Sequence, residues 1–150
     1  MLNAIFFYRI SRWLYLHHIP FLPKLITLVI FLIYNSKIPY QAEIGKGTLF
    51  GYGGIGVVIH SKSIIGSYCT VCQQVTIGGG GNSKFPGVPV IGNNVYIAKG
   101  AIVMGGISIG NNVTIGANAV VTKSVSDNAI VAGVPAKVLR YKKDSEKQLC

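Results

Sequence analysis

One histidine stands where a side chain could exchange protons with a substrate. His60 ends the segment GYGGIGVVIH, directly after a glycine-rich stretch and a short aliphatic run. A neutral imidazole accepts and returns a proton near neutral pH, which suits general-base catalysis. The other histidines, His17 and His18, lie in an apolar N-terminal segment. We therefore predict His60 as the catalytic base. The alternative is a solvent-facing residue at a repeat position where glycine or alanine is more common.

Two of the three cysteines, Cys69 and Cys72, form the sequence C-T-V-C. This spacing occurs in metal half-sites and in redox pairs. A zinc site would need two further ligands, and His60 is the nearest candidate. The repeat described below gives both cysteines a structural place, so we predict no metal. An odd cysteine count without a signal peptide favours a reducing cytoplasm.

The composition predicts one folded domain that binds an anion. Of 150 residues, 50% are hydrophobic and 12% are charged, which is typical of a chain with a buried core. The formal net charge of +10 attracts nucleic acid, anionic lipid or a phosphate-bearing cofactor. No long basic run, helix-turn-helix spacing or zinc-finger spacing is present, so we predict no nucleic-acid partner.

From Ile38 onward, aliphatic residues recur every six positions. Such a period is typical of a parallel β-helix, in which three hexads make one triangular coil of about eighteen residues. The fifth position of each hexad also faces inward and must be small. Asn-Asn pairs at 93–94 and 111–112 are expected at corners, where Asn tolerates a positive φ. The aliphatic positions are Ile59, Ile65, Val71, Ile77, Ile91, Ile97, Val103, Ile109, Ile115 and Val121, and the small ones are Ser63, Cys69, Val75, Val95, Ala101, Val113 and Ala119.

The period breaks twice, between Ile44 and Ile59 and between Ile77 and Ile91. Insertions in a solenoid become loops at one corner, where such folds often bind ligands. His60 directly follows the first break, which supports its assignment to a site.

Residues 1–37 differ from the repeats that follow. The segment around Arg9, Arg12 and Trp13 fits an amphipathic helix, Pro20 and Pro23 interrupt it, and a second apolar run follows. That run has ten residues, whereas a bilayer crossing needs about twenty. One interpretation is an interfacial membrane anchor with both arginines and Lys24 at headgroup level. The other is a pair of helices that caps the next domain or packs on a neighbouring subunit, and the two are compatible.

The segment from about Ile38 to Arg140 resembles the left-handed β-helix acyltransferases. The branch is the one similar to serine acetyltransferases and to O-acetyltransferases of surface polysaccharides. The resemblance rests on the hexads, on QQVTIGG at 73–79 and on VAGVPAKVLR at 131–140. We thus expect an all-β, left-handed parallel β-helix at 38–140, preceded by short N-terminal helices at 1–37 and followed by a polar tail at 141–150.

The resemblance implies a homotrimer with three sites between neighbouring β-helices, where a histidine deprotonates an acceptor hydroxyl that attacks acetyl-CoA. It implies that the acceptor lies near Tyr52 and Gly54. Acetyl-CoA is expected to bind as a co-substrate along small and cationic residues, with Arg140 as an auxiliary. These cofactor residues are Gly79, Gly80, Lys99, Gly100, Ala117, Lys123 and Lys137.

The match to serine acetyltransferases has two gaps. Their Asp-His pair falls here on Gly51 and Tyr52, and their second histidine falls on Val88. A short apolar leader suits an enzyme at the inner face of a membrane, so we predict cytoplasmic O-acetylation of a surface-polysaccharide precursor sugar. The alternatives are serine as the acceptor and, from another class, a non-catalytic trimeric CoA-binding or scaffold module.

Overall fold

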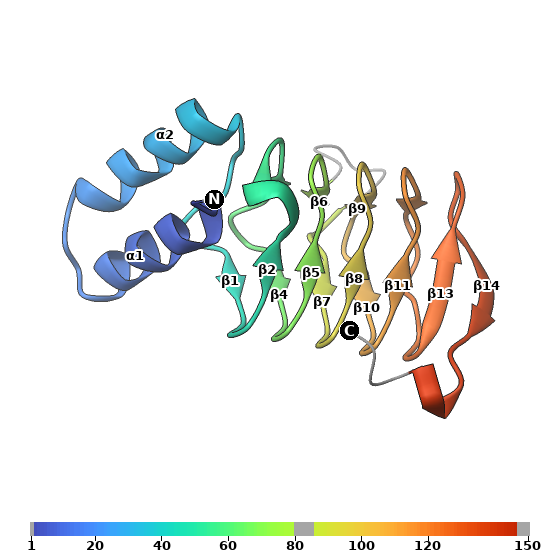
Figure 1. Ribbon diagram of the computed structural model, residues 1–150. Coiled ribbons are helices and arrows are strands. Elements are labelled where there is room, and N and C mark those ends of the chain that lie inside the picture. The colour runs from blue at the N-terminus through green and yellow to red at the C-terminus, as the bar shows by residue number, and fades with distance from the viewer. Residues whose placement is uncertain (1, 80–85, 147–150) are drawn as a thin grey trace.

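The computed structural model describes residues 2–79 and 86–146, and it folds as a triangular prism closed at one end by two helices (Figure 1). The chain begins with α1 (Ala4–Leu16) and α2 (Leu22–Tyr34), and short strands make up the rest. Three parallel sheets form the faces of the prism. Face 1 contains β1 (Glu43–Ile44), β4 (Ile64–Ile65), β7 (Val90–Ile91) and β10 (Ser108–Ile109). Face 2 contains β2 (Leu49–Phe50), β5 (Thr70–Val71), β8 (Tyr96–Ile97), β11 (Thr114–Ile115), β13 (Ala129–Ala132) and the antiparallel β14 (Lys137–Tyr141). Face 3 contains β3 (Val58–Ile59), β6 (Thr76–Gly78), β9 (Ile102–Met104) and β12 (Val120–Val121).

The six-residue period becomes the core of the prism. Each coil visits faces 1, 2 and 3 in turn, so that Ile97 pairs with Ile115, eighteen residues later. All of the aliphatic and small positions predicted from the period are buried. Apart from Ser63, they belong to one hydrophobic cluster inside the prism. The prediction of a parallel β-helix is therefore confirmed.

Polar groups at one corner link successive coils. The side-chain oxygen of Asn93 accepts a hydrogen bond from the Ser67 amide, that of Asn111 accepts from the Asn93 amide, and that of Asp127 accepts from the Asn111 amide, each at 2.8 Å. The second residue of each Asn pair has a positive φ, 54° at Asn94 and 57° at Asn112. The Asn-Asn pairs thus serve both functions of a tight corner, as predicted.

The structure locates the first break in the period. Phe50 is buried at the sixth position after Ile44, so the three extra residues lie between Phe50 and Ile59. The corner between faces 2 and 3 there contains the kinked 3₁₀ segment η1 (Gly51–Gly54), in which Tyr52 and Gly53 have positive φ angles of 49° and 73°. The second break lies between β6 and β7, at the corner between faces 3 and 1. The two breaks therefore lie at different corners of the prism.

The helices close the N-terminal end of the prism. The Tyr8 hydroxyl donates to the Ala42 carbonyl at 2.6 Å, and burial raises the pKa of this phenol. The Arg9 guanidinium donates to the carbonyls of Ile44 and Gly45, and Arg12 donates to those of Tyr40 and Gln41. Both arginines thus turn toward the β-helix, as in the interpretation of a helix pair that caps the next domain. Within the described residues, neither helix is long and apolar enough to cross a bilayer.

One buried hydroxyl in the core has no hydrogen-bond partner among the described residues. Ser63 occupies a fifth position, and its Oγ is fully enclosed. An unsatisfied buried polar atom costs about 1 to 3 kcal/mol. We therefore expect Ser63→Ala to raise the free energy of unfolding by about 1 kcal/mol, measured by urea denaturation. The reverse exchange at an equivalent position, Ala101→Ser, should lower the free energy of unfolding by a similar amount. A change of the same sign in both variants would contradict this interpretation.

Candidate active site

The end of β3 places His60 at one edge of face 3. The His60 amide donates to the Ile77 carbonyl of the next coil at 2.8 Å, so the backbone is fixed by the strand ladder. The side chain is exposed, as expected for the second position of a hexad. It borders a hollow of about 270 Å³, lined also by Lys37, Thr76 and Gly79. Gly79 is a predicted cofactor residue, so the structure brings these two predictions together.

Lys37 and Thr76 are lining residues that sequence reasoning missed. Lys37 precedes the hexads, and a β-bridge to Val58 brings it beside β3. Thr76 lies on β6, directly next to Val58 in the register of face 3. The six-residue period could have indicated Thr76, because it is an outward position next to a buried one. Lys37 lies outside the period, and no local pattern points to it.

The hydrogen bond of the His60 ring defines its tautomer. Nδ1 accepts from the backbone N–H of Lys62 at 3.1 Å. A neutral ring that accepts at Nδ1 carries its proton on Nε2. In this arrangement Nε2 is a donor, and a base at Nε2 requires the ring to leave the Lys62 amide. Since the side chain is exposed, such a rotation displaces no packed neighbour.

The opposite edge of face 3 holds most of the other predicted residues. We call the segments that precede the strands of face 3 the leading edge and those that follow them the trailing edge. Tyr52, Lys99, Gly100 and Ala117 lie on the leading edge, whereas His60, Gly79 and Lys123 lie on the trailing edge. A strand rises about 3.3 Å per residue, so the two edges lie roughly 10 Å or more apart. One chain therefore does not bring the two sets together.

The two predicted acceptor residues differ in access. Tyr52 projects into solvent and has a φ of 49°. Gly54 is buried, and a Cβ there would lie 3.2 Å from the Ala4 side chain and from the Phe50 ring. Gly54 thus serves the packing of α1 against the prism, and its burial does not favour contact with an acceptor. Gly80 lies outside the described residues.

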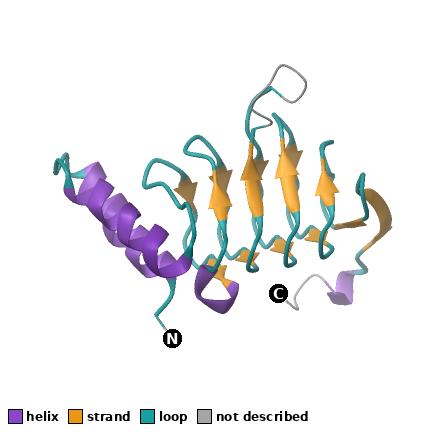
Figure 2. Ribbon diagram, turned by 90° about the horizontal axis from the view of Figure 1, so that it is seen from above, coloured by secondary structure: helices purple, strands orange, loops and turns teal. Residues whose placement is uncertain are grey.

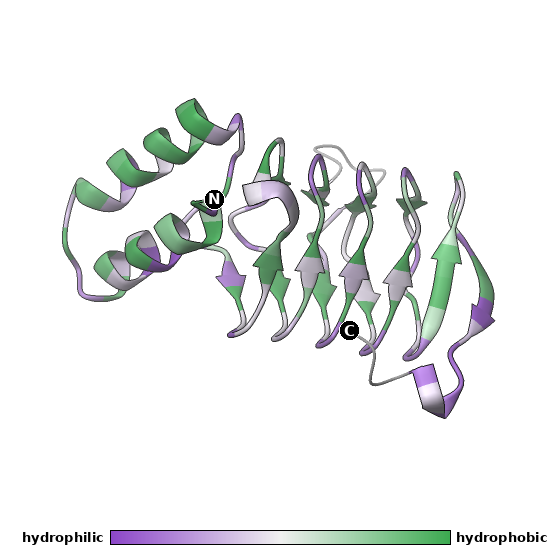
Figure 3. Ribbon diagram, viewed as in Figure 1, coloured by the Kyte–Doolittle hydropathy of each residue, from purple (hydrophilic) through white to green (hydrophobic). Residues whose placement is uncertain are grey.

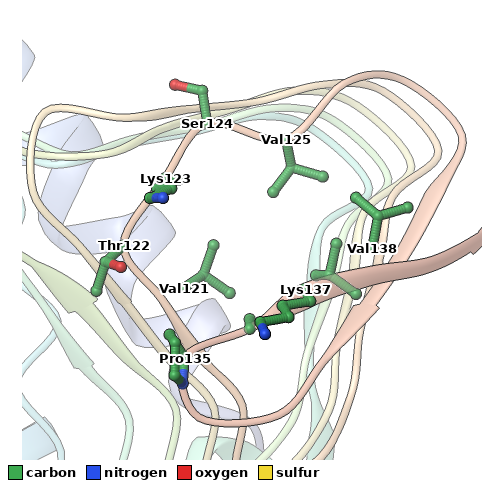
Figure 4. A pocket seen from close by; sticks show the side chains of 10 residues that line it. Val121, Thr122, Lys123, Ser124, Val125, Pro135, Lys137 and Val138 are labelled. Atoms are coloured by element: carbon green, nitrogen blue, oxygen red, sulfur yellow. The ribbon is translucent and has the colours of Figure 1, made fainter.

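Lys123 and Lys137 meet at the C-terminal end of the prism. They line one hollow of about 310 Å³, together with Thr122 and Ser124 (Figure 4). The two ammonium groups come from separate segments, one after β12 and the other at the start of β14. The two lysines suit an anion such as a nucleotide phosphate, whereas valine, proline and alanine make up most of the remaining lining. The predicted auxiliary, Arg140, is instead paired with Glu146, at 2.8 and 3.1 Å, and this pairing lowers the pKa of that carboxyl to about 2.

The cysteines occupy separate environments. Cys69 is buried at a fifth position of the core, and burial raises the pKa of its thiol. Cys72 is half-buried after β5, and its Sγ lies 3.4 Å from the Tyr96 hydroxyl. Both thiols are free. Across residues 2–79 and 86–146, no three His, Cys, Asp or Glu side chains gather as a metal site.

Comparison with known proteins shows where this geometry recurs. The bacterial transferase hexapeptide family, described as six repeats, matches residues 89–123. The serine acetyltransferase of Synechococcus elongatus is 38% identical over 137 residues, which is 91% of this chain and 56% of that protein. The chain thus has the left-handed β-helix fold and carries the hexapeptide repeat of that family at residues 89–123. The expected resemblance and fold class are thus confirmed, although the chain spans little more than half of that relative.

Solved structures similar to this hexapeptide-repeat chain include two with bound small molecules. The serine acetyltransferase of Brucella abortus in complex with coenzyme A has a TM-score of 0.86 at 30% identity, covering 93% of this chain and 56% of that one. The serine acetyltransferase of Neisseria gonorrhoeae in complex with serine has a TM-score of 0.82 at 30% identity, covering 91% and 55%.

Proposed function

We propose that this chain is an O-acetyltransferase that moves the acetyl group of acetyl-CoA to a hydroxyl, with L-serine as the expected acceptor. The observation that carries the proposal is the similarity to serine acetyltransferases over 91% of the chain. It supports serine better than the saccharide acceptor expected from the sequence.

The residues of the site fit acetyl-CoA as a co-substrate. The cationic hollow of Lys123 and Lys137 suits its phosphates. Ala117, a small and exposed residue, leaves room along the leading edge for its narrow arm, whereas the Asn118 side chain fills the space beside Gly100. Acetyl-CoA supplies the thioester carbonyl that the acceptor hydroxyl attacks. A C–O bond forms, the C–S bond breaks, and the hydroxyl proton passes through a base to the departing thiolate.

His60 is the proposed base. Its imidazole lies on the trailing edge, beside Gly79. In contrast, His17 caps the C-terminus of α1 and His18 follows it in the turn between the helices. To accept a proton at Nε2, the ring must exchange the Lys62 amide for a hydrogen-bond acceptor at Nδ1. A carbonyl from a neighbouring subunit would supply that partner.

The positions of the two edges support a head-to-tail ring of copies, and the resemblance implies that this ring is a trimer. His60 and Gly79 lie on the trailing edge, and Tyr52, Gly100 and Ala117 lie on the leading edge. A head-to-tail ring of copies places the trailing edge of one chain against the leading edge of the next. Each of the three interfaces then holds one complete site.

A saccharide hydroxyl is the second candidate acceptor, favoured by Tyr52 and Val88. Tyr52 is highly exposed, and Val88 lies in the second break beside Gly79. These two residues stand where the resemblance expects imidazoles of serine acetyltransferases. An altered pair of side chains at the acceptor position indicates an altered acceptor.

The deciding experiment follows acetyl transfer from radiolabelled acetyl-CoA to L-serine, to nucleotide sugars and to lipid-linked saccharides. We expect labelled O-acetylserine, with a buffer lacking acceptor as the control for thioester hydrolysis. If label appears in a saccharide and not in serine, the acceptor is the saccharide hydroxyl and the proposal of serine is wrong. Tight CoA binding without transfer to any acceptor would refute the enzyme and favour a CoA-binding module.

A further inference from the structure

The N-terminal helix pair exposes a large apolar surface that the prism does not cover. On α2, only Pro23, Ile30 and Tyr34 are buried. Figure 3 shows that the hydrophobic colour covers α2 on the side away from the β-helix as well. The outward residues of α2 are Leu22, Leu25, Leu28, Phe31, Leu32 and Ile33, with Leu32 at 71% exposure. Contiguous surfaces of this kind mark sites of protein or membrane contact.

The outward face of α1 continues this surface. Phe6, Ile10 and Trp13 follow one another at helical spacing, on the side opposite the buried residues. The two helices are antiparallel neighbours, since the Ser11 hydroxyl donates to the Pro23 carbonyl and the Phe7 ring lies against Tyr34. We call the outward residues of both helices, together with Phe21, the helix face.

The turn between the helices holds a large ring out toward solvent. Phe21 is 79% exposed and has a φ of 67°, and His18 in the same turn has a φ of 56°. A bulky residue with a positive φ is strained, and such strain is common where a segment serves a function. The turn lies at the end of the helix pair farthest from the prism (Figures 1 and 2). The prism therefore does not obstruct contact between this turn and an external surface.

Charge distinguishes the possible occupants of the helix face. Residues 2–42 contain Arg9, Arg12, Lys24 and Lys37 and no acidic residue. Arg9 and Arg12 turn toward the β-helix, and Arg12 lies 3.9 Å from Glu43, so the cation beside the helix face is Lys24, which is exposed on the first turn of α2. A second copy of the same face would bring like charges together. An anionic bilayer surface complements both the charge and the apolar residues.

We infer that the helix face binds the surface of a bilayer containing anionic lipids, with Phe21 at the deepest point. Trp13 then lies at headgroup depth, where aromatic rings are favoured. The helices lie in the interface without crossing it, in agreement with their thirteen residues each. In the trimer proposed above, three such faces at one end would add avidity, although one face suffices for the inference.

The first test uses the unaltered chain and its single tryptophan. Trp13 lies on the helix face and is 55% exposed, so its fluorescence reports on this surface alone. With vesicles of phosphatidylcholine and phosphatidylglycerol, we expect a blue shift of its emission and co-sedimentation of the chain. Vesicles of phosphatidylcholine alone should bind less. An unshifted emission and a chain that stays in the supernatant with anionic vesicles would overturn the inference.

The second test alters the helix face. Leu25→Ser combined with Leu28→Ser and Leu32→Ser should weaken binding to anionic vesicles at least tenfold, because less apolar area enters the bilayer. The matched control is Leu139→Ser, an equally exposed leucine on β14 at the other end of the prism, which should leave binding unchanged. The inference fails if anionic vesicles do not bind the unaltered chain and the triple variant forms a smaller oligomer in solution. In that case a second copy of the chain occupies the helix face. Neither test involves acetyl transfer, so the outcome is separate from that of the proposed function.

Discussion

Replacement of His60 by alanine is expected to lower the kcat of acetyl transfer by a factor of about 10² to 10⁴, because general-base assistance contributes a factor of that size to the rate. The measurement is kcat with acetyl-CoA and the acceptor at saturation. CoA binding by calorimetry should be unchanged, since the cationic hollow lies at the far end of the prism. His18→Ala is the matched control, because His18 is an exposed histidine in the turn after α1 and should leave kcat unaltered.

A second substitution separates two roles of the same ring. A neutral His60 ring that accepts at Nδ1 from the Lys62 amide has its proton on Nε2, where it can donate a hydrogen bond to the substrate but cannot accept one. The side-chain amide of glutamine can also donate a hydrogen bond from about the position of Nε2, but it cannot act as a base. If His60 is the base, His60→Gln is as inactive as His60→Ala. A glutamine variant with most of the native rate would mean that His60 stabilises the developing oxyanion, and our assignment of the base would be wrong.

The largest effect on stability is expected for the inward aliphatic positions. Ile65 is 1% exposed, and it stacks between Ile44 and Ile91 in the register of face 1. Ile65→Ala leaves a cavity that the rigid coils cannot close, and we expect a loss of about 2 to 5 kcal/mol in the free energy of unfolding. Denaturation by urea at one protein concentration measures this loss.

The neighbouring residue provides the control. Ile64 has the same side chain on the same strand, but it points outward and is 40% exposed. Ile64→Ala should cost less than half as much as Ile65→Ala. Equal losses at the two positions would contradict the account of a core built from every sixth residue.

The fold could be predicted because its rule is local and repeats. Ile97 and Ile115 occupy equivalent positions of successive coils, so their spacing alone indicates their contact. Phe50 was harder to place, because an aromatic residue departs from the aliphatic pattern. Its ring fits at the first coil because Gly54 beside it lacks a side chain. The exact position of the first break depends on this tertiary contact.

The site could be predicted only in part. The period places His60 directly after the buried Ile59, and the structure shows its side chain exposed at the end of β3. The period does not show that Arg140 is held by Glu146, or that Arg9 turns toward the carbonyls of Ile44 and Gly45. The hydrogen-bond partners of long side chains depend on which groups the tertiary structure places within their reach. For the same reason, the hydrogen bond that sets the tautomer of His60 has no signal in the sequence.

The central claim is that a complete site lies between two copies of the chain, and a mixture of two defective variants tests it most directly. His60→Ala disables the trailing edge, and Ala117→Trp blocks the leading edge. Each variant alone should be inactive. Co-expressed in mixed trimers, they should recover about a quarter of the native acetyl transfer, because some interfaces pair one intact edge of each kind. Mixed trimers that stay as inactive as either variant alone would show that the two edges do not meet in one site, and would contradict the account.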